Sequence, residues 1–245
     1  MLDLWREGWS GANISYEYHF WRAQYYDFGG VAHAKVINDD IKYYRENNIH
    51  GVIEDGSQRS FFPTGLAFYT YARTLYDASL SAEEIAEEYF SAAFGEDWRK
   101  FYDYLSELGE AFDFKYLAGE RNANGNKFSF CINPEYKKNM ERAKEILDRG
   151  ATLIAEHYNS EYRIRTVSVR LLEMHAKYAR LMIDPLLAKA EGDHDGADKL
   201  IEKVKEEIGK YELAFERWYD HDLVFATWAR RMQERTPSSE PILIV

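Results

Sequence analysis

The chain has 245 residues, enough for one large domain or two smaller ones. Its net charge is −11 at pH 7 and no block rich in Lys and Arg stands out. Nucleic acid is therefore not an expected partner, because binding it depends on neutralising phosphates. No apolar run approaches the roughly 20 residues of a membrane helix, and "MLDLWREGWS" lacks the apolar core of a secretory signal. We expect a soluble protein with no membrane partner, and a cytoplasmic location is favoured.

The first 60 residues have the pattern of a strand, a helix and a second strand. Residues 14–20 alternate, with Ser15, Glu17 and His19 on one face and aromatic side chains on the other. A helical pattern follows over 33–47, and "IHGVIEDGSQ" reads as a second strand that runs into a loop. This spacing is typical of a βαβ unit, so we expect the two strands to be parallel neighbours.

After Pro63 the pattern indicates only helices. "SAEE" predicts a capping box between Ser81 and Glu84, at the start of a helix that ends at Gly95. "AGERNANGNKF" reads as a loop, and Pro185 is expected to bend or break the helix that contains it. The expected helices cover residues 66–77, 82–94, 98–117, 134–158, 160–191 and 195–233.

These elements predict a mainly α fold in two parts. Residues 1–63 would be the partial end of a (β/α) barrel with two short parallel strands, and 64–235 an α-helical bundle domain, followed by a tail at 236–245. Two parallel strands do not make a stable sheet alone. We therefore expect a missing N-terminal portion, or a second copy in a homo-oligomer, to cover the strand edges.

Four segments resemble a known family when taken in order. "YEYHFWRAQYYD", "INDDIKYY", "GVIEDGSQRSFFPTGLAFYTYARTLYD" and "EEYFSAAFGEDWRKFYDYL" resemble the bacterial domain of unknown function 4838, a glycoside-hydrolase-like group similar to α-glucuronidase and β-hexosaminidase barrels. The resemblance covers roughly residues 5–108. It implies the last part of a (β/α)8 barrel followed by a packed helical domain.

The same resemblance bears on catalysis. It implies a catalytic acid pair on an earlier barrel strand, which this sequence does not contain, so the catalytic residues stay unknown. The parent protein would be a glycoside hydrolase, and this chain alone is expected to be inactive. Its expected contribution is sugar binding at the barrel mouth and a helical buttress.

Polar and aromatic residues gather where the two predicted strands end, which is where such barrels bind substrate. Carboxylates can hold sugar hydroxyls and an indole can stack on a sugar face, so carbohydrate is the expected partner. The candidate substrate-binding residues are Glu17, His19, Trp21, Arg22, Glu54, Asp55, Gln58 and Arg59. An equally weighted alternative is that the cluster around Glu17 and His19 is a buried polar group that locks the strand to the helix. Glu17 facing Glu54 or Asp55 would be a carboxylate pair at glycosidase spacing, although hydroxyl binding is favoured over catalysis.

No cofactor or metal is expected. Cys131 is the single cysteine, and the acidic segments around His194 and His221 lack convergent ligand spacing. The competing hypothesis for the whole chain is a non-catalytic helical interaction or assembly domain, in which the 19 Tyr, 14 Phe and 6 Trp serve as core and interface. Exposed Tyr and Trp beside Glu17 and Asp55 would favour sugar, whereas an extended apolar helical face would favour a protein partner.

Overall fold

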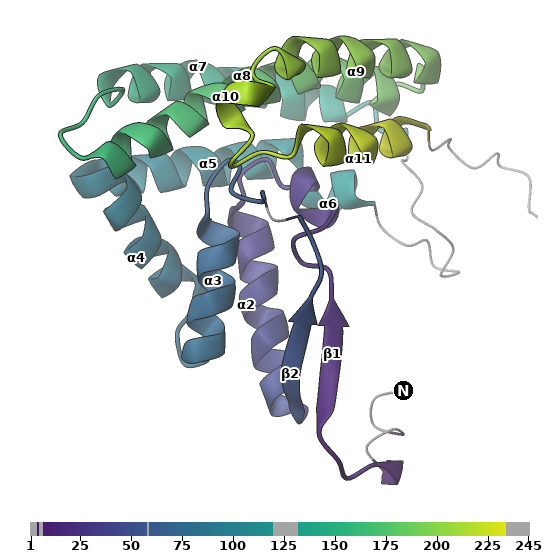
Figure 1. The fold of residues 1–245 in the computed structure, drawn as a ribbon. Helices are drawn as coiled ribbons and strands as arrows, with labels where there is room; N and C mark the ends of the chain where they lie inside the picture. The colour runs from purple at the N-terminus through teal and green to yellow at the C-terminus, as the bar shows by residue number, and fades with distance from the viewer. Residues whose placement is uncertain (1–3, 5–6, 58, 120–131, 234–245) are drawn as a thin grey trace, which may run out of the picture.

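The computed structural model describes residues 4, 7–57, 59–119 and 132–233. The protein is mainly helical with a small two-stranded parallel sheet. Figure 1 shows the sheet and its neighbouring helices below a broad layer of longer helices. Both strands point their carboxyl ends toward this layer. The predicted loop at 118–128, apart from its first two residues, and the predicted tail lie outside the described residues.

The sheet consists of β1 (Asn13–Glu17) and β2 (Ile49–Glu54), which pair in parallel with Glu17 opposite Glu54. The predicted parallel pairing is therefore confirmed. The predicted extent of the first strand, to residue 20, is wrong. A turn closes there because Trp21 N donates to Tyr18 O at 3.1 Å, and the short 3-10 helix η1 (Ala23–Tyr26) follows.

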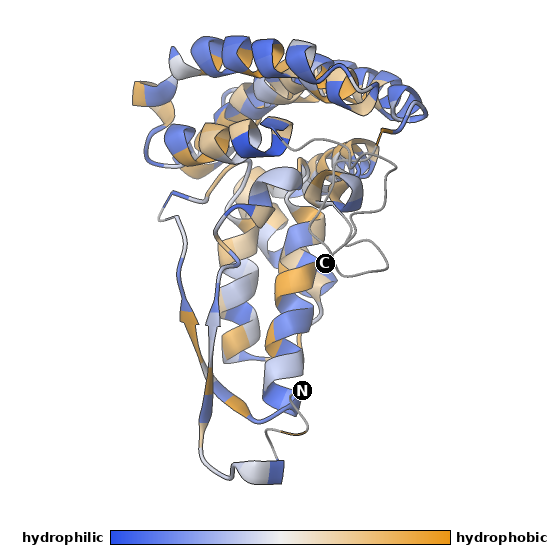
Figure 2. Cartoon of the chain, turned by 90° about the vertical axis from the view of Figure 1, so that its right-hand side faces the viewer, coloured by the Kyte–Doolittle hydropathy of each residue, from blue (hydrophilic) through white to orange (hydrophobic). Residues whose placement is uncertain are grey.

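Two helices cover one face of the sheet. They are α2 (Val31–Glu46), which follows Gly30 in the left-handed conformation, and α3 (Leu66–Tyr76). Phe20 packs with Ile37 and Ile41 of α2, and its ring stacks on Phe68 of α3 with 3.8 Å between centroids. In Figure 2, where the strands stand to one side of these helices, no described element covers their other face.

The helical layer is built on one apolar core. Phe28, just before α2, stacks on Phe112 with 3.8 Å between ring centroids and on Tyr178 with 5.5 Å, so the N-terminal part is anchored in this core. The helices are α4 (Ala82–Phe94), α5 (Trp98–Phe112), α6 (Phe114–Ala118), α7 (Tyr136–Glu156), α8 (Arg163–Ala190), α9 (His194–Gly209), α10 (Glu212–Phe215) and α11 (His221–Gln233), with the 3-10 helix η2 (Gly95–Asp97) between α4 and α5.

Three helix predictions need correction. The helix predicted over 98–117 divides at Asp113, whose φ is +57° and whose carboxylate accepts a hydrogen bond from Tyr116 N, capping α6. The helix containing Pro185 is not broken there, since buried neighbours such as Met182 and Leu186 hold it in the core. The helix predicted over 195–233 is three helices.

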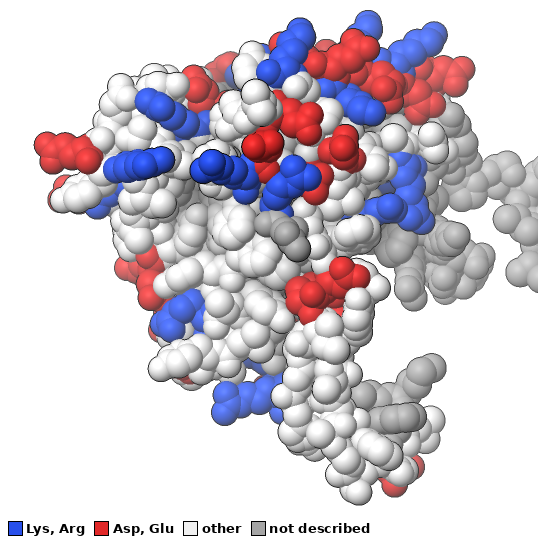
Figure 3. Space-filling view, in the orientation of Figure 1, with Lys and Arg blue, Asp and Glu red and all other residues white. Residues whose placement is uncertain are grey.

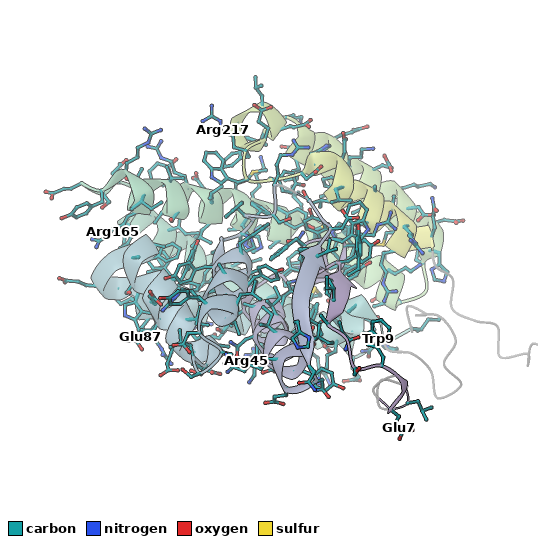
Figure 4. All side chains as sticks on the ribbon, turned by 60° about the horizontal axis from the view of Figure 1, so that its bottom comes forward. Glu7, Trp9, Arg45, Glu87, Arg165 and Arg217 are labelled. Carbon is teal, nitrogen blue, oxygen red and sulfur yellow. The ribbon has the colours of Figure 1, made fainter. Side chains whose placement is uncertain are left out.

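The break between α10 and α11 has a tertiary cause. Phe61 N donates to Trp218 O at 3.1 Å, and Tyr219 forms a β-bridge with Ser60. These bonds hold residues 218 and 219 in a non-helical conformation, and Arg217 projects outward beside them (Figure 4). Asp220 then caps α11 by accepting a hydrogen bond from Leu223 N at 3.1 Å.

Candidate functional site

The candidate site lies at the carboxyl ends of β1 and β2, where the strands meet the helical layer. Figure 3 shows acidic side chains gathered there, while the surface below them, over the strands, is uncharged. Because side chains alternate along a strand, the predicted residues divide between two faces. Glu17, His19 and Glu54 lie on the face toward α2. Together with Asp40 of α2 they form what we call the helix-facing cluster.

His19 is the centre of the helix-facing cluster. It is buried, with 7% of its surface exposed, and both ring nitrogens contact carboxylates. Nδ1 lies 2.7 Å from Glu54 Oε2 and Nε2 lies 3.3 Å from Asp40 Oδ2. A carboxylate only accepts, so both bonds form together only when the ring carries two protons. Burial lowers the pKa of His19, but the hydrogen bonds to Asp40 and Glu54 outweigh it and leave the pKa raised above 6.5.

Neighbouring groups hold the cluster in place. The Ser15 hydroxyl donates to Glu17 Oε1, and His33 Nε2 donates to His19 O at 2.8 Å. Burial raises the pKa of Tyr44 on α2, and the hydrogen bond to Glu17 and its negative charge raise this pKa further. The Tyr44 phenol therefore keeps its proton beside that carboxylate. The cluster therefore joins β1 and β2 to α2. This is the arrangement expected under the alternative hypothesis, in which polar groups around Glu17 and His19 hold the strand to the helix.

The opposite side of the sheet is open. We call it the open sheet face, formed by Ile14, Tyr16, Tyr18 and Ile53, each of which is more than half exposed. Asp55 follows β2 on this side, and its Oδ2 accepts a hydrogen bond from the Tyr16 hydroxyl at 2.9 Å. That bond raises the pKa of Tyr16 to about 12, so the phenol keeps its proton. An exposed carboxylate is thus fixed beside exposed aromatic rings.

The remaining predicted residues lie in the turns that follow the strands. Trp21 is 37% exposed, and the centroid of the Trp21 ring lies 5.9 Å from the guanidinium carbon of Arg22. Arg59 points to the helical layer, where its Nη2 lies 3.3 Å from Asp220 Oδ2. Gln58 lies outside the described residues.

The structure brings together only some of the predicted site. Glu17 and Glu54 sit side by side on paired strands, whereas Glu17 and Asp55 point to opposite faces of the sheet. Sequence analysis did not single out Asp40, Tyr44 or Tyr16. The alternation of 14–20 placed Tyr16 on the face opposite Glu17, but the prediction gave that face no role.

The described residues add two general observations. They contain no group of three or more His, Cys, Asp or Glu side chains arranged to hold a metal ion. None of the described helices is both long enough and apolar enough to cross a lipid bilayer. In the segments around His194 and His221, Asp193 caps α9 by accepting a hydrogen bond from Gly196 N at 2.9 Å, and His221 Nε2 lies 3.1 Å from Lys205 O.

Comparison with protein-family models, curated proteins and solved structures finds no match to this chain.

Proposed function

We propose that this chain is the C-terminal portion of a carbohydrate-active, glycoside-hydrolase-like protein. Its βα unit would contribute sugar-binding side chains at a barrel mouth, and its helical layer would buttress the barrel. The observation that carries the proposal is the Tyr16–Asp55 pair on the open sheet face. A fixed carboxylate beside exposed aromatic rings suits a sugar, which presents both hydroxyls and an apolar ring face.

The arrangement of the sheet supports the proposal in a second way. In a (β/α) barrel the helices cover the outer face of the strands and the inner face points to other strands. Here α2 and α3 cover one face, and within the described residues the other face and both outer edges are without partners. The open sheet face corresponds to the inside of such a barrel.

The proposal assigns different roles to the two sets of predicted residues. Asp55 and Trp21, joined by Tyr18, are the groups that would contact a sugar, because Asp55 and Tyr18 are exposed at the open sheet face and Trp21 is exposed in the turn that follows β1. His19 and Glu54 would act as positioning residues, since their charges are used within the helix-facing cluster. Glu17 would support the same cluster through Ser15 and Tyr44.

NMR titration of the isotopically labelled chain with N-acetylglucosamine and with glucuronic acid tests the proposal. We expect the amide signals of Tyr16, Tyr18 and Asp55 to shift in a saturable way with at least one sugar. Asp55→Asn should weaken binding by about tenfold or more, because a hydrogen bond to a charged group contributes roughly 1.5–3 kcal/mol. Trp21→Ala should weaken it by up to about tenfold through lost ring stacking.

Tyr76→Ala is the matched control, because Tyr76 is an exposed aromatic residue on α3 that lies outside the proposed site. Its loss should leave sugar affinity unchanged. If neither sugar shifts the open-face signals, or if Tyr76→Ala weakens binding as much as Trp21→Ala, sugar binding at this site is refuted.

One observation favours the competing function of a protein-interaction domain. A groove of about 640 Å³ runs between α7 and α8 and is lined mainly by apolar side chains such as Leu147, Ile154 and Tyr158. The two cations on its rim are paired, since Arg180 bonds Asp148 and Lys177 bonds Glu207, and the exposed Glu173 accepts a hydrogen bond from the Tyr158 hydroxyl. The groove thus offers a partner a mainly apolar contact with its two cations already paired, and Ala151→Arg would block it while leaving sugar binding intact.

A further inference from the structure

A pocket of about 470 Å³ lies where four segments of the helical layer meet. Its lining comes from the end of α4, from η2, from the end of α7 and from the loop that leads into α8. Two buried apolar residues, Phe94 and Val169, belong to it, and the other lining side chains are polar or charged. In Figure 4, Arg165 of this pocket and Trp9, which precedes β1, lie on opposite sides of the view. The pocket is thus separate from the open sheet face.

Hydrogen bonds hold the segments around the pocket in place. His157 Nε2 lies 2.9 Å from Asp97 Oδ2, which joins the end of α7 to η2. The Thr166 hydroxyl accepts a hydrogen bond from Ser160 N at 3.0 Å and donates to Ser160 O at 3.2 Å. Tyr162 N donates to the Ser160 hydroxyl at 3.2 Å. The loop between α7 and α8 is therefore tied to the start of α8, and a ligand would meet a preformed wall.

Arg165 carries a hydrogen-bonding group that this part of the chain does not use. Its guanidinium carbon lies 4.7 Å from the centroid of the Tyr162 ring. The guanidinium also lies against Gly95, where a Cβ atom would come within 2.7 Å of Arg165 Cζ and Nη1. No hydrogen bond or ion pair joins Arg165 to another described residue. A guanidinium has five N–H donors in a planar fork that matches a carboxylate, so one that is held in place but not bonded is prepared for an anion.

The charges around Arg165 limit the class of anion. Asp97 is already occupied, because its Oδ1 pairs with Lys100 Nζ at 2.8 Å. Glu96 and Glu156 line the pocket, are exposed, and form no ion pair within the described chain, although the charge of Glu156 acts on Lys100 through space. Two such carboxylates repel a dianion and attract a positive group beside a carboxylate bound to Arg165. A zwitterion satisfies both conditions.

We propose that this pocket binds a small zwitterion of the α-amino acid class. Arg165 holds the carboxylate of the ligand, and Glu96 and Glu156 attract its ammonium group. The volume of the pocket lies within the range of small-molecule sites, about 300–1,000 Å³. This binding does not depend on what the open sheet face binds.

NMR titration of the isotopically labelled full chain with L-serine, acetate and inorganic phosphate tests the proposal. We expect L-serine to shift the side-chain Nε–H signal of Arg165 and the amide signals of Asn159 and Tyr162 in a saturable way. Acetate should bind about tenfold more weakly, because it lacks the ammonium group, and phosphate should bind more weakly than L-serine because of its second negative charge. No saturable shift with L-serine, or equal affinity for acetate or phosphate, would overturn the proposal.

Substitution of Arg165 separates ligand binding from a structural role. Arg165→Gln should weaken L-serine binding by about tenfold or more and should leave the Tm of the free chain nearly unchanged. Arg99→Gln is the matched control, because Arg99 also stacks on a tyrosine, with 5.2 Å to the Tyr102 centroid, but pairs with Asp103 at 3.2 Å and does not line the pocket. Its affinity for L-serine should stay unchanged. If Arg165→Gln lowers Tm without weakening L-serine binding, or if both substitutions weaken it equally, the guanidinium does not serve a ligand.

Discussion

At the scale of single residues, the charge of His19 is what distinguishes the helix-facing cluster from an ordinary polar contact. Glu17 and Glu54 lie on adjacent strands, which are only about 4.8 Å apart in a sheet, and like charges so placed repel. A protonated His19 beside Glu54 and Asp40 offsets this repulsion. The cluster is therefore stable as a unit of acids and one cation, and removal of the cation should affect all of it.

This charge predicts a pH-dependent stability. Because the pKa of His19 is raised in the folded chain, its stabilising contribution is complete below the ordinary histidine value of 6.5 and is lost as the pH rises through the raised pKa. His19→Gln should therefore lower the free energy of unfolding more at acidic than at alkaline pH. Urea unfolding at a series of pH values on both sides of 6.5 measures the difference. Asp40→Asn should reduce the same pH dependence, and a difference that is constant with pH would contradict the assigned charge.

The sequence predicts correctly which side chains share one side of the first strand, because the alternation of side chains along a strand alone decides this. It placed Ser15, Glu17 and His19 on one side of the first strand, and the structure has them there. It could not say which side faces a helix, because that depends on where α2 crosses the sheet. Asp40 enters the cluster, and Tyr44 comes to lie beside Glu17, only through that crossing.

At the scale of elements, α4 shows how far local chemistry specifies a helix. The predicted capping box is confirmed in both directions: Glu84 N donates to the Ser81 hydroxyl at 3.1 Å, and Ser81 N donates to Glu84 Oε2 at 2.8 Å. The predicted end at Gly95 is also confirmed, with φ of +78°. Each signal lies within a few residues of the boundary it sets.

Loss of this cap should have a measurable cost. Ser81→Ala leaves Glu84 N without its side-chain acceptor, and we expect it to destabilise the chain by about 1 kcal/mol. In thermal unfolding this corresponds to a decrease in Tm of roughly 2–4 °C for a chain of this size. Ser91→Ala on the same helix is the control, because its hydroxyl only bonds the backbone of Glu88, and it should change Tm little. Equal effects of the two substitutions would show that the cap contributes nothing specific.

The breaks that sequence analysis missed have distant causes. Residues 195–233 keep helical periodicity, but Ser60 and Phe61, far back in the chain, bond residues 218 and 219 and interrupt the helix. Similarly, Pro185 stays inside α8 because burial on both sides outweighs the local cost of proline. Tertiary contacts override propensity in both cases, and a single sequence does not reveal those contacts.

At the scale of the whole molecule, stability is distributed unevenly. Phe112, Leu172 and Trp228 are fully buried in the helical core, whereas Ile14, Tyr16 and Ile53 of the sheet are more than half exposed. A parallel sheet normally has both faces covered. In the described residues β1 and β2 have one covered face and two unpaired outer edges, which is the condition that led us to expect a further portion or a second copy.

Hydrogen exchange tests whether the sheet needs such a cover. For the chain alone at low concentration, we expect the amides of β1 and β2 to exchange well before those in the middle of α8, because the strands open locally without unfolding the helical core. Protection of the strands that rises with protein concentration, together with a doubled mass in solution, would identify a second copy as the cover. Protection that stays low at all concentrations would exclude a second copy as the cover. The barrel hypothesis, in which other strands cover the sheet, would then be favoured. If the strands were instead as slow as α8 in a monomer, the sheet would be stable without any cover, and both the barrel and the oligomer hypotheses would lose their structural basis.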